Sequence, residues 1–230
     1  MDKVEAISKV IDKNSITKIK PQIDYQSIII NYFDLGVRNG WELDKFIEFC
    51  DSYKIKYQIY GFEACRDLCD KLQNKYRNNS LININHLAIS STDNQSIKLY
   101  HAADPDGNSI FNSKENLLDT NSRFELCKSI KISTFIQNIT KTTNSINIIK
   151  ANIEGAEYDV IKDLYNENKL KYFDYYIGAG WTTDMHWVGE LKDKVQEIET
   201  ILETNNIKTY YFARGWNQHN NIDFNDLIHS

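Results

Sequence analysis

Short apolar runs alternate with amphipathic segments along most of the chain. Runs with the length and apolar content of β-strands occupy residues 27–34, 57–62, 81–89, 97–101, 129–133, 146–153, 172–177 and 207–212. Segments with a helical spacing of apolar residues occupy 41–54, 66–76, 135–140, 158–168 and 191–205. Strands that alternate with helices are typical of a parallel sheet covered by helices on both faces. The pattern therefore predicts an α/β fold with a doubly wound, mainly parallel sheet.

One domain accounts for most of the chain. Residues 26–214 contain all the predicted strands and form a single Rossmann-like domain on this interpretation. Residues 1–25 are expected to be a helical extension, because their first apolar residues have the spacing of a short amphipathic helix and Pro21 ends that pattern. The polar segment 215–230 is interpreted as a C-terminal tail.

The stretch 102–123 has no periodic pattern and contains the sequence DPDG at residues 104–107, which is a strong turn signal. Unpatterned loops of this length in a compact domain tend to be functional lids or mobile segments. A lid over the functional site is one interpretation of this loop, and the sequence leaves its closure open.

Two apolar runs end in a carboxylate, which is followed by a glycine and a helix-like segment. The first reads IIINYFDLGVRNG at residues 28–40, and the second reads IIKANIEGAE at residues 148–157. A polar residue at the carboxyl end of a buried strand faces the crevice in which open α/β sheets bind their ligands. Two such units on one chain predict a nucleotide-type cofactor held at a switch point of the sheet.

Composition narrows the classes of function. The formal net charge of -5 gives no general attraction to nucleic acid, so no nucleic-acid partner is expected. The four cysteines include no Cys-x-x-Cys pair, which fits buried thiols in a reducing cytosol. No apolar run approaches the roughly 20 residues that span a bilayer. Residues 1–10 also lack the apolar segment of a secretory signal, so a cytoplasmic location is expected.

Four short motifs, in this order and each at the end of a predicted strand, resemble those of the FkbM family of S-adenosylmethionine-dependent methyltransferases. They are DLGVRNG at 34–40, FEA at 62–64, AIS at 88–90 and KANIEGAE at 150–157. The resemblance covers roughly residues 28–177 and implies a Rossmann-like fold of the class I methyltransferase type. The chain departs from the family pattern where Asn152 replaces an aspartate and Ala64 replaces a proline. Residues 37–38 are larger than the small residues that the family has in this glycine loop. The strand that runs into residues 178–181 also lacks the acidic and histidine residues with which the family usually ends it.

The resemblance implies that the first strand ends bind S-adenosylmethionine. Gly36 and Gly40 would let the backbone approach the ligand closely, and the next helix would offer N–H groups to its carboxylate. Asp34 would accept a hydrogen bond from the ligand ammonium, directly or through water, and Glu63 would bind both ribose hydroxyls. Ala88 would leave room beside the adenine. The alternative interpretations are a turn cap for Asp34, a helix-start glutamate for Glu63 and core packing for Ala88.

Asn152 and Glu154 are two residues apart on a predicted strand, so they point to the same face, near the transferred methyl group. Methylation of a hydroxyl requires a proton acceptor, and Glu154 is the first candidate for this base or for substrate binding. His186 is the second candidate base, in a segment, 178–187, whose tryptophans could stack on a sugar ring. Asn152 can orient a hydroxyl or contact the cofactor but cannot act as a base at neutral pH. Glu157 is expected to stabilise the start of the next helix.

The resemblance implies methyl transfer to a hydroxyl of a sugar or small molecule, as in the modification of a glycan or a secondary metabolite, with N-methylation left open. No metal is expected, although Asp34, Asn152 and Asp184 leave a magnesium site conceivable. One alternative is a binding module that keeps the cofactor fold without catalysis, which Asn152 motivates. Another is a nicotinamide-dependent oxidoreductase, which is disfavoured because the turn carries Gly-x-x-x-Gly rather than Gly-x-Gly-x-x-Gly. Aromatic residues at 210–212 and 216 indicate core packing or the edge of a homo-oligomer.

Overall fold

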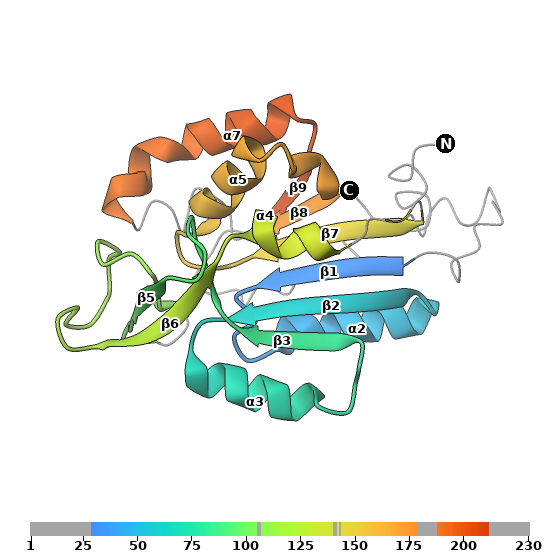
Figure 1. The fold of residues 1–230 in the computed structure, drawn as a ribbon, viewed down its shortest axis with the longest axis horizontal. Coiled ribbons are helices and arrows are strands. Elements are labelled where there is room, and N and C mark those ends of the chain that lie inside the picture. The colour runs from blue at the N-terminus through green and yellow to red at the C-terminus, as the bar shows by residue number, and fades with distance from the viewer. Residues whose placement is uncertain (1–28, 105–106, 140–141, 143, 179–187, 212–230) are drawn as a thin grey trace.

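A six-stranded parallel sheet forms the centre of the protein (Figure 1). The computed structural model describes residues 29–104, 107–139, 142, 144–178 and 188–211. In spatial order the strands are β3 (Ile82–His86), β2 (Lys56–Glu63), β1 (Ile29–Leu35), β7 (Ser145–Ala151), β8 (Tyr175–Gly178) and β9 (Lys208–Tyr211). Every neighbouring pair is parallel, which confirms the predicted α/β class and the mainly parallel sheet.

The direction in which strands are added reverses between β1 and β7. The chain first places β2 and β3 on one side of β1, and it later returns to place β7, β8 and β9 on the other side. The carboxyl ends of β1 and β7 lie side by side, because Leu35 is in register with Ala151. Open α/β sheets bind their ligands outside the carboxyl ends of the strands at such a reversal. A ligand site is therefore expected just beyond these two residues.

Helices cover both faces of the sheet (Figure 1). α2 (Trp41–Tyr53) and α3 (Arg66–Tyr76) pack on one face, and α4 (Ile132–Phe135), α5 (Glu157–Asn166) and α7 (Val195–Thr204) pack on the other. Successive side chains of β1 alternate between the two cores: Tyr32 packs with α2, whereas Phe33 lies in the core beneath α5. The ring of Tyr32 stacks on Phe46 with centroids 4.1 Å apart. Burying one large apolar side chain stabilises the fold by about 1.5–3 kcal/mol. Because β1 presents such side chains to both faces, the sheet is stable only when helices cover both of them.

A second, three-stranded sheet follows β3. β4 (Ala88–Ile89) pairs with β6 (Phe124–Ile130), and β6 pairs with β5 (Ser96–Tyr100). The prediction of one strand over 81–89 is therefore wrong. The chain turns at Leu87, whose N–H donates to the Asn85 carbonyl at 3.0 Å, and it then leaves the parallel sheet. The prediction of an edge strand at 129–133 is also wrong, because β6 begins at Phe124 and is the central strand of this sheet.

The 102–123 loop connects β5 to β6 and is tied down by isolated β-bridges. These bridges join Tyr100 to Ser109, Ala102 to Leu117, and Lys114 to Val188. The last one attaches the loop to the main domain, just before a 3₁₀ helix, Gly189–Lys194, that leads into α7. The loop therefore carries Ser109 and Lys114 to the carboxyl end of the parallel sheet.

The N-terminal extension predicted at 1–25 and the tail predicted at 215–230 lie outside the described residues. The helix predicted at 191–205 is present, with its first part wound as the 3₁₀ helix before α7. Among the helices that the structure describes, none has the length and apolar character needed to cross a membrane.

Candidate functional site

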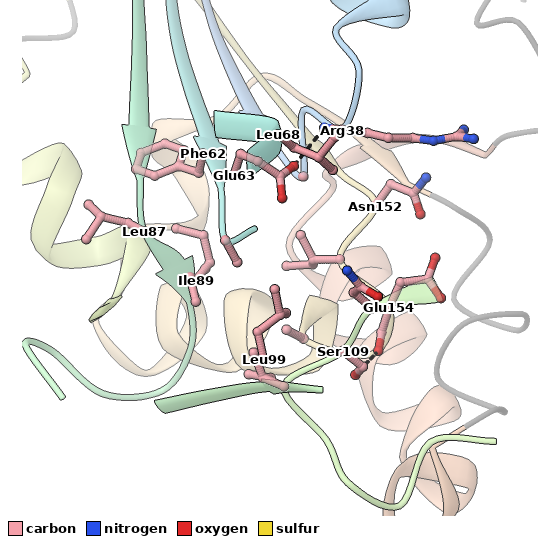
Figure 2. A pocket seen from close by; sticks show the side chains of 17 residues that line it. Arg38, Phe62, Glu63, Leu68, Leu87, Ile89, Leu99, Ser109, Asn152 and Glu154 are labelled. Carbon is pink, nitrogen blue, oxygen red and sulfur yellow. Dashed lines mark hydrogen bonds between the residues drawn. The ribbon is translucent and has the colours of Figure 1, made fainter. Parts of the chain in front are cut away.

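A pocket opens at the carboxyl ends of β1, β2 and β7, where the strand order reverses. Its lining also includes residues from β4 and from the 102–123 loop. The small and polar lining residues include Gly36, Arg38, Glu63, Ala88, Ser109, Asn152 and Glu154. Figure 2 shows the apolar side chains of Phe62, Leu87 and Ile89 on one side of the pocket. The charged side chains of Arg38 and Glu154 lie on the other side.

The turn after β1 packs tightly between its neighbours. Gly36 has a φ of +83°, and a β-carbon on it would collide with the carbonyl oxygen of Asn152. The N–H groups of Gly36 and Val37 both donate to the carbonyl of Phe62, at 2.9 and 3.2 Å. Glycine is required at position 36, since only a residue without a side chain allows both this φ and this backbone approach.

Gly40 serves the packing of α3 rather than the pocket. Its φ is +79°, and a β-carbon on it would lie 2.6 Å from the hydroxyl of Tyr76. That hydroxyl donates to the Gly40 carbonyl at 3.0 Å and lies 2.8 Å from a carboxylate oxygen of Asp44. Gly40 thus starts α2 at the point where α3 crosses it.

A buried ion cluster of Asp34, Glu42 and Lys150 lies behind the turn. The ammonium of Lys150 is 2.9 Å from Asp34 Oδ1 and 2.9 Å from Glu42 Oε2, and it donates to the carbonyl of Gly36 at 2.7 Å. The side chains of Asp34 and Lys150 are almost completely removed from solvent. The Lys150 ammonium therefore compensates the buried charge of Asp34 through a close ion pair.

Burial and charge act against each other in this cluster. Burial raises the pKa of Asp34 to about 6, although the Lys150 ammonium acts in the opposite direction. Burial also lowers the pKa of Lys150, but the carboxylates of Asp34 and Glu42 outweigh it and leave that pKa above its ordinary value. At neutral pH the cluster therefore holds a protonated lysine and an ionised Asp34.

Glu63 ends β2 and holds the glycine turn in place. Its Oε2 accepts a hydrogen bond from the backbone N–H of Arg38 at 2.8 Å, and its Oε1 accepts one from the N–H of Cys65 at 2.9 Å. Burial raises the pKa of Glu63, and these two hydrogen bonds partly offset the rise. A carboxylate oxygen can accept more than one hydrogen bond, so Glu63 keeps acceptor capacity toward the pocket that it lines.

Ala88 belongs to the apolar side of the pocket. It is buried in β4, and Leu68, Leu87, Ile89 and Leu99 line the pocket around it. These side chains come from α3, β4, β5 and the turn between the two sheets. A small residue among larger apolar ones leaves room for a flat apolar ligand group.

The turn after β7 is fixed from within by Glu157. The carboxylate of Glu157 accepts hydrogen bonds from the N–H groups of Ile153 and Gly155, each at 2.7 Å. Within this turn Glu154 has a φ of +56°, a conformation that costs a non-glycine residue roughly 1–2 kcal/mol. Gly155 lets Val188 approach, since a β-carbon on Gly155 would lie 2.6 Å from a Val188 methyl group. The strained backbone of Glu154 is therefore held by the contacts around it.

Lys114 pairs with Glu154 across the pocket wall. The Lys114 ammonium is 3.0 Å from Glu154 Oε2 and donates to the carbonyl of Gly107 at 2.9 Å. The hydroxyl of Ser109 donates to the carbonyl of Glu154 at 2.8 Å. Burial raises the pKa of Glu154, and Lys114 partly opposes that rise. The 102–123 loop thus holds both the backbone and the side chain of Glu154.

The structure brings Gly36, Glu63, Ala88, Asn152 and Glu154 together around one pocket. Asp34 and Gly40 lie directly behind the pocket and do not line it. His186 falls outside the described residues, as does Asp184 of the conceivable magnesium site. The roles of all these residues in binding and catalysis stay predictions.

Three functional candidates escaped the sequence analysis. Lys150 had a signal, because a lysine interrupts an otherwise apolar strand and a buried charge requires a partner. Lys114 and Ser109 had none, since they stand in an unpatterned loop. Within the residues that the structure describes, no group of three or more His, Cys, Asp or Glu side chains could hold a metal ion.

A comparison with protein-family models matches residues 34–208 to the methyltransferase FkbM domain. The matched region begins at Asp34 and contains every residue that lines the pocket. No curated protein and no solved structure matches the chain significantly.

Proposed function

Because the chain belongs to the FkbM methyltransferase family, we propose that it transfers a methyl group from S-adenosylmethionine to a hydroxyl of a sugar or another small molecule. The observation that supports this most is the composition of the pocket at the strand reversal. Its apolar side ends in the carboxylate of Glu63, and its other side carries the carboxylate of Glu154 (Figure 2). One side suits a nucleoside, and the other suits a hydroxylated acceptor.

The residues on the apolar side fit the methyl donor. Ala88 and the side chains around it would hold the adenine, and Glu63 would accept hydrogen bonds from the ribose hydroxyls. The turn at Gly36 would face the methionine part, where the packing leaves no space for a side chain. When bound, S-adenosylmethionine supplies an electrophilic methyl group on a positively charged sulfur.

On the polar side, Glu154 would act as the general base. As the acceptor oxygen bonds to the methyl carbon and the carbon–sulfur bond breaks, Glu154 would take the hydroxyl proton. Burial raises the pKa of Glu154, which makes its carboxylate a better proton acceptor, while Lys114 favours the ionised form. Asn152 would orient the hydroxyl, and this alignment supplies part of the rate enhancement. His186 stays the second candidate base.

Calorimetric titration of the full chain with S-adenosylmethionine and S-adenosylhomocysteine tests the donor. We expect saturable binding that weakens roughly tenfold in Glu63→Gln, as for the loss of one charged hydrogen-bond acceptor. Glu48→Gln on the exposed face of α2 is the matched control and should bind as wild type does. If the folded protein bound neither molecule, the proposal would be overturned; saturable binding of a nicotinamide cofactor instead would indicate an oxidoreductase.

Release of S-adenosylhomocysteine in the presence of a panel of sugars and other hydroxylated compounds tests the reaction. Turnover with a hydroxyl acceptor that is lost in Glu154→Gln and kept in His186→Gln supports Glu154 as the base. The reverse result would assign the base to His186. Affinity for the donor without turnover on any hydroxyl or amine acceptor would favour a non-catalytic binding module.

A further inference from the structure

The ion cluster behind the glycine turn has more negative than positive groups. Asp34 and Glu42 supply two formal negative charges, and Lys150 supplies one positive charge between them at 2.9 Å from each. Lys150 also donates a hydrogen bond to the carbonyl of Gly36. The cluster therefore carries a formal charge of about -1 in a region from which water is largely excluded.

This charge lies close to the pocket. Gly36 lines the pocket with its backbone, and its carbonyl oxygen is 2.7 Å from the Lys150 ammonium on the other side of the turn. One turn of backbone thus separates the cluster from any ligand beside Gly36. Glu63, at the end of β2, adds to the negative field on Asp34. A ligand group with a positive charge is favoured at this place over a neutral group of the same shape.

The two ligands of a methyltransferase differ in this respect. The donor has a positively charged sulfonium, and the product S-adenosylhomocysteine has a neutral thioether sulfur, while the adenosine, ammonium and carboxylate are common to both. When the methyl carbon leaves, the electron pair of the broken bond stays on sulfur and the positive charge disappears. The difference between the affinities for donor and product therefore isolates the response of the pocket to that one charge.

Resting on the proposed function, we propose that Asp34, Glu42 and Lys150 form an electrostatic selectivity element, which favours the charged methyl donor over the neutral product and so promotes product release. A unit charge that lies one turn of backbone away, with an effective dielectric constant of about 20 to 40, changes an affinity by roughly 5- to 30-fold. Removing one carboxylate from the cluster should lower donor affinity by such a factor more than it lowers product affinity, because any loss at the shared ammonium is common to both ligands.

The test is calorimetric titration of wild type, Glu42→Gln and Asp34→Asn with donor and product. Glu42 is the gentler site, because its side chain is 21% exposed, whereas that of Asp34 is fully buried. Sinefungin, which carries an amine cation in place of the sulfonium, is the third probe and should lose affinity together with the donor. Glu48→Gln removes the same charge from the outer face of α2 and should leave the ratio of affinities unchanged.

The outcomes separate this inference from the proposed function. Selective loss of donor and sinefungin affinity supports the electrostatic element. Equal loss for all three ligands would show that the cluster shapes the turn or acts only on parts that the ligands share, such as the ammonium. No loss for any ligand would show that the charge of the cluster has no effect on binding. Either result overturns the inference while the donor assignment stands. If wild type bound none of the three, the proposed function itself would fail.

Discussion

Gly36 and the carbonyl oxygen of Asn152 are so close that no β-carbon fits between the turn after β1 and the end of β7. The two motifs, more than a hundred residues apart in the chain, therefore meet backbone to backbone at the strand reversal. Pocket-lining residues at the ends of two adjacent strands are thus fixed relative to each other by main-chain packing.

We expect Gly36→Ala to lower the free energy of unfolding by about 2 kcal/mol or more, since alanine disfavours a positive φ and its methyl group displaces Asn152. Donor affinity should fall as well, because the displaced residue lines the pocket. Chemical denaturation and calorimetry measure the two effects. Gly189→Ala is the control: a β-carbon there meets its nearest atom at 4.0 Å, so a comparable loss in this variant would contradict the explanation.

Lys114→Met should leave the Glu154 carboxylate without its cation. We expect the pKa of Glu154 to rise further, and the free energy of unfolding to fall by roughly 2–4 kcal/mol, because the pair is largely buried. Carboxyl ¹³C NMR titration of Glu154 and urea denaturation measure these changes. Lys192→Met breaks an exposed pair with Glu115 and should cost less than about 1 kcal/mol. Equal losses of unfolding free energy in both variants would mean that burial does not make the Lys114–Glu154 pair more important for stability than an exposed pair.

The raised pKa of Asp34 predicts an unusual dependence of the free energy of unfolding on pH. Burial raises its pKa in the folded protein from the ordinary value of 3.8 to about 6; Lys150 opposes this rise, and Glu42 and Glu63 add to it. The folded state therefore binds the proton more tightly than the unfolded state, and lowering the pH from 7.5 to 5 favours folding. We expect the unfolding free energy of wild type relative to Asp34→Asn to increase by about 1 kcal/mol over this range. A decrease measured by urea denaturation at the two pH values would contradict this assignment.

Glu157→Gln should loosen the turn that carries Glu154. The carboxylate accepts two backbone hydrogen bonds, and an amide can accept only one of them while its NH₂ group faces the other donor. We expect a loss of about 1–3 kcal/mol in the free energy of unfolding, because a buried N–H is left without an acceptor. Glu167→Gln at the end of α5, whose side chain is 46% exposed, is the control and should change stability by less than about 1 kcal/mol.

The sequence predicts the centre of the parallel sheet well because β1, β2, β7 and β8 are local apolar runs, and their ends carry Glu63, Asn152 and Glu154 to one pocket. It fails at β4 and β6, where pairing depends on partners far along the chain rather than on a local period. The ion pair between Lys114 and Glu154 could not be predicted for the same reason. A contact between a loop and a strand end does not produce a pattern in the spacing of residues along the chain.

The second sheet encloses a segment, between β4 and β6, that can vary independently of the parallel sheet. Ile89 and Ile130 are partners in adjacent strands, so the segment between them leaves the domain and returns at nearly the same place. Its length and sequence can change without shifting the register of the six parallel strands, since the cost of closing a longer loop grows only slowly. This segment carries Ser109 and Lys114, whereas Gly36 and Glu63 lie at the carboxyl ends of β1 and β2 in the parallel sheet. An insertion that closes on itself in this way can be exchanged as a module, so one side of the pocket can change while the side formed by Gly36 and Glu63 is kept.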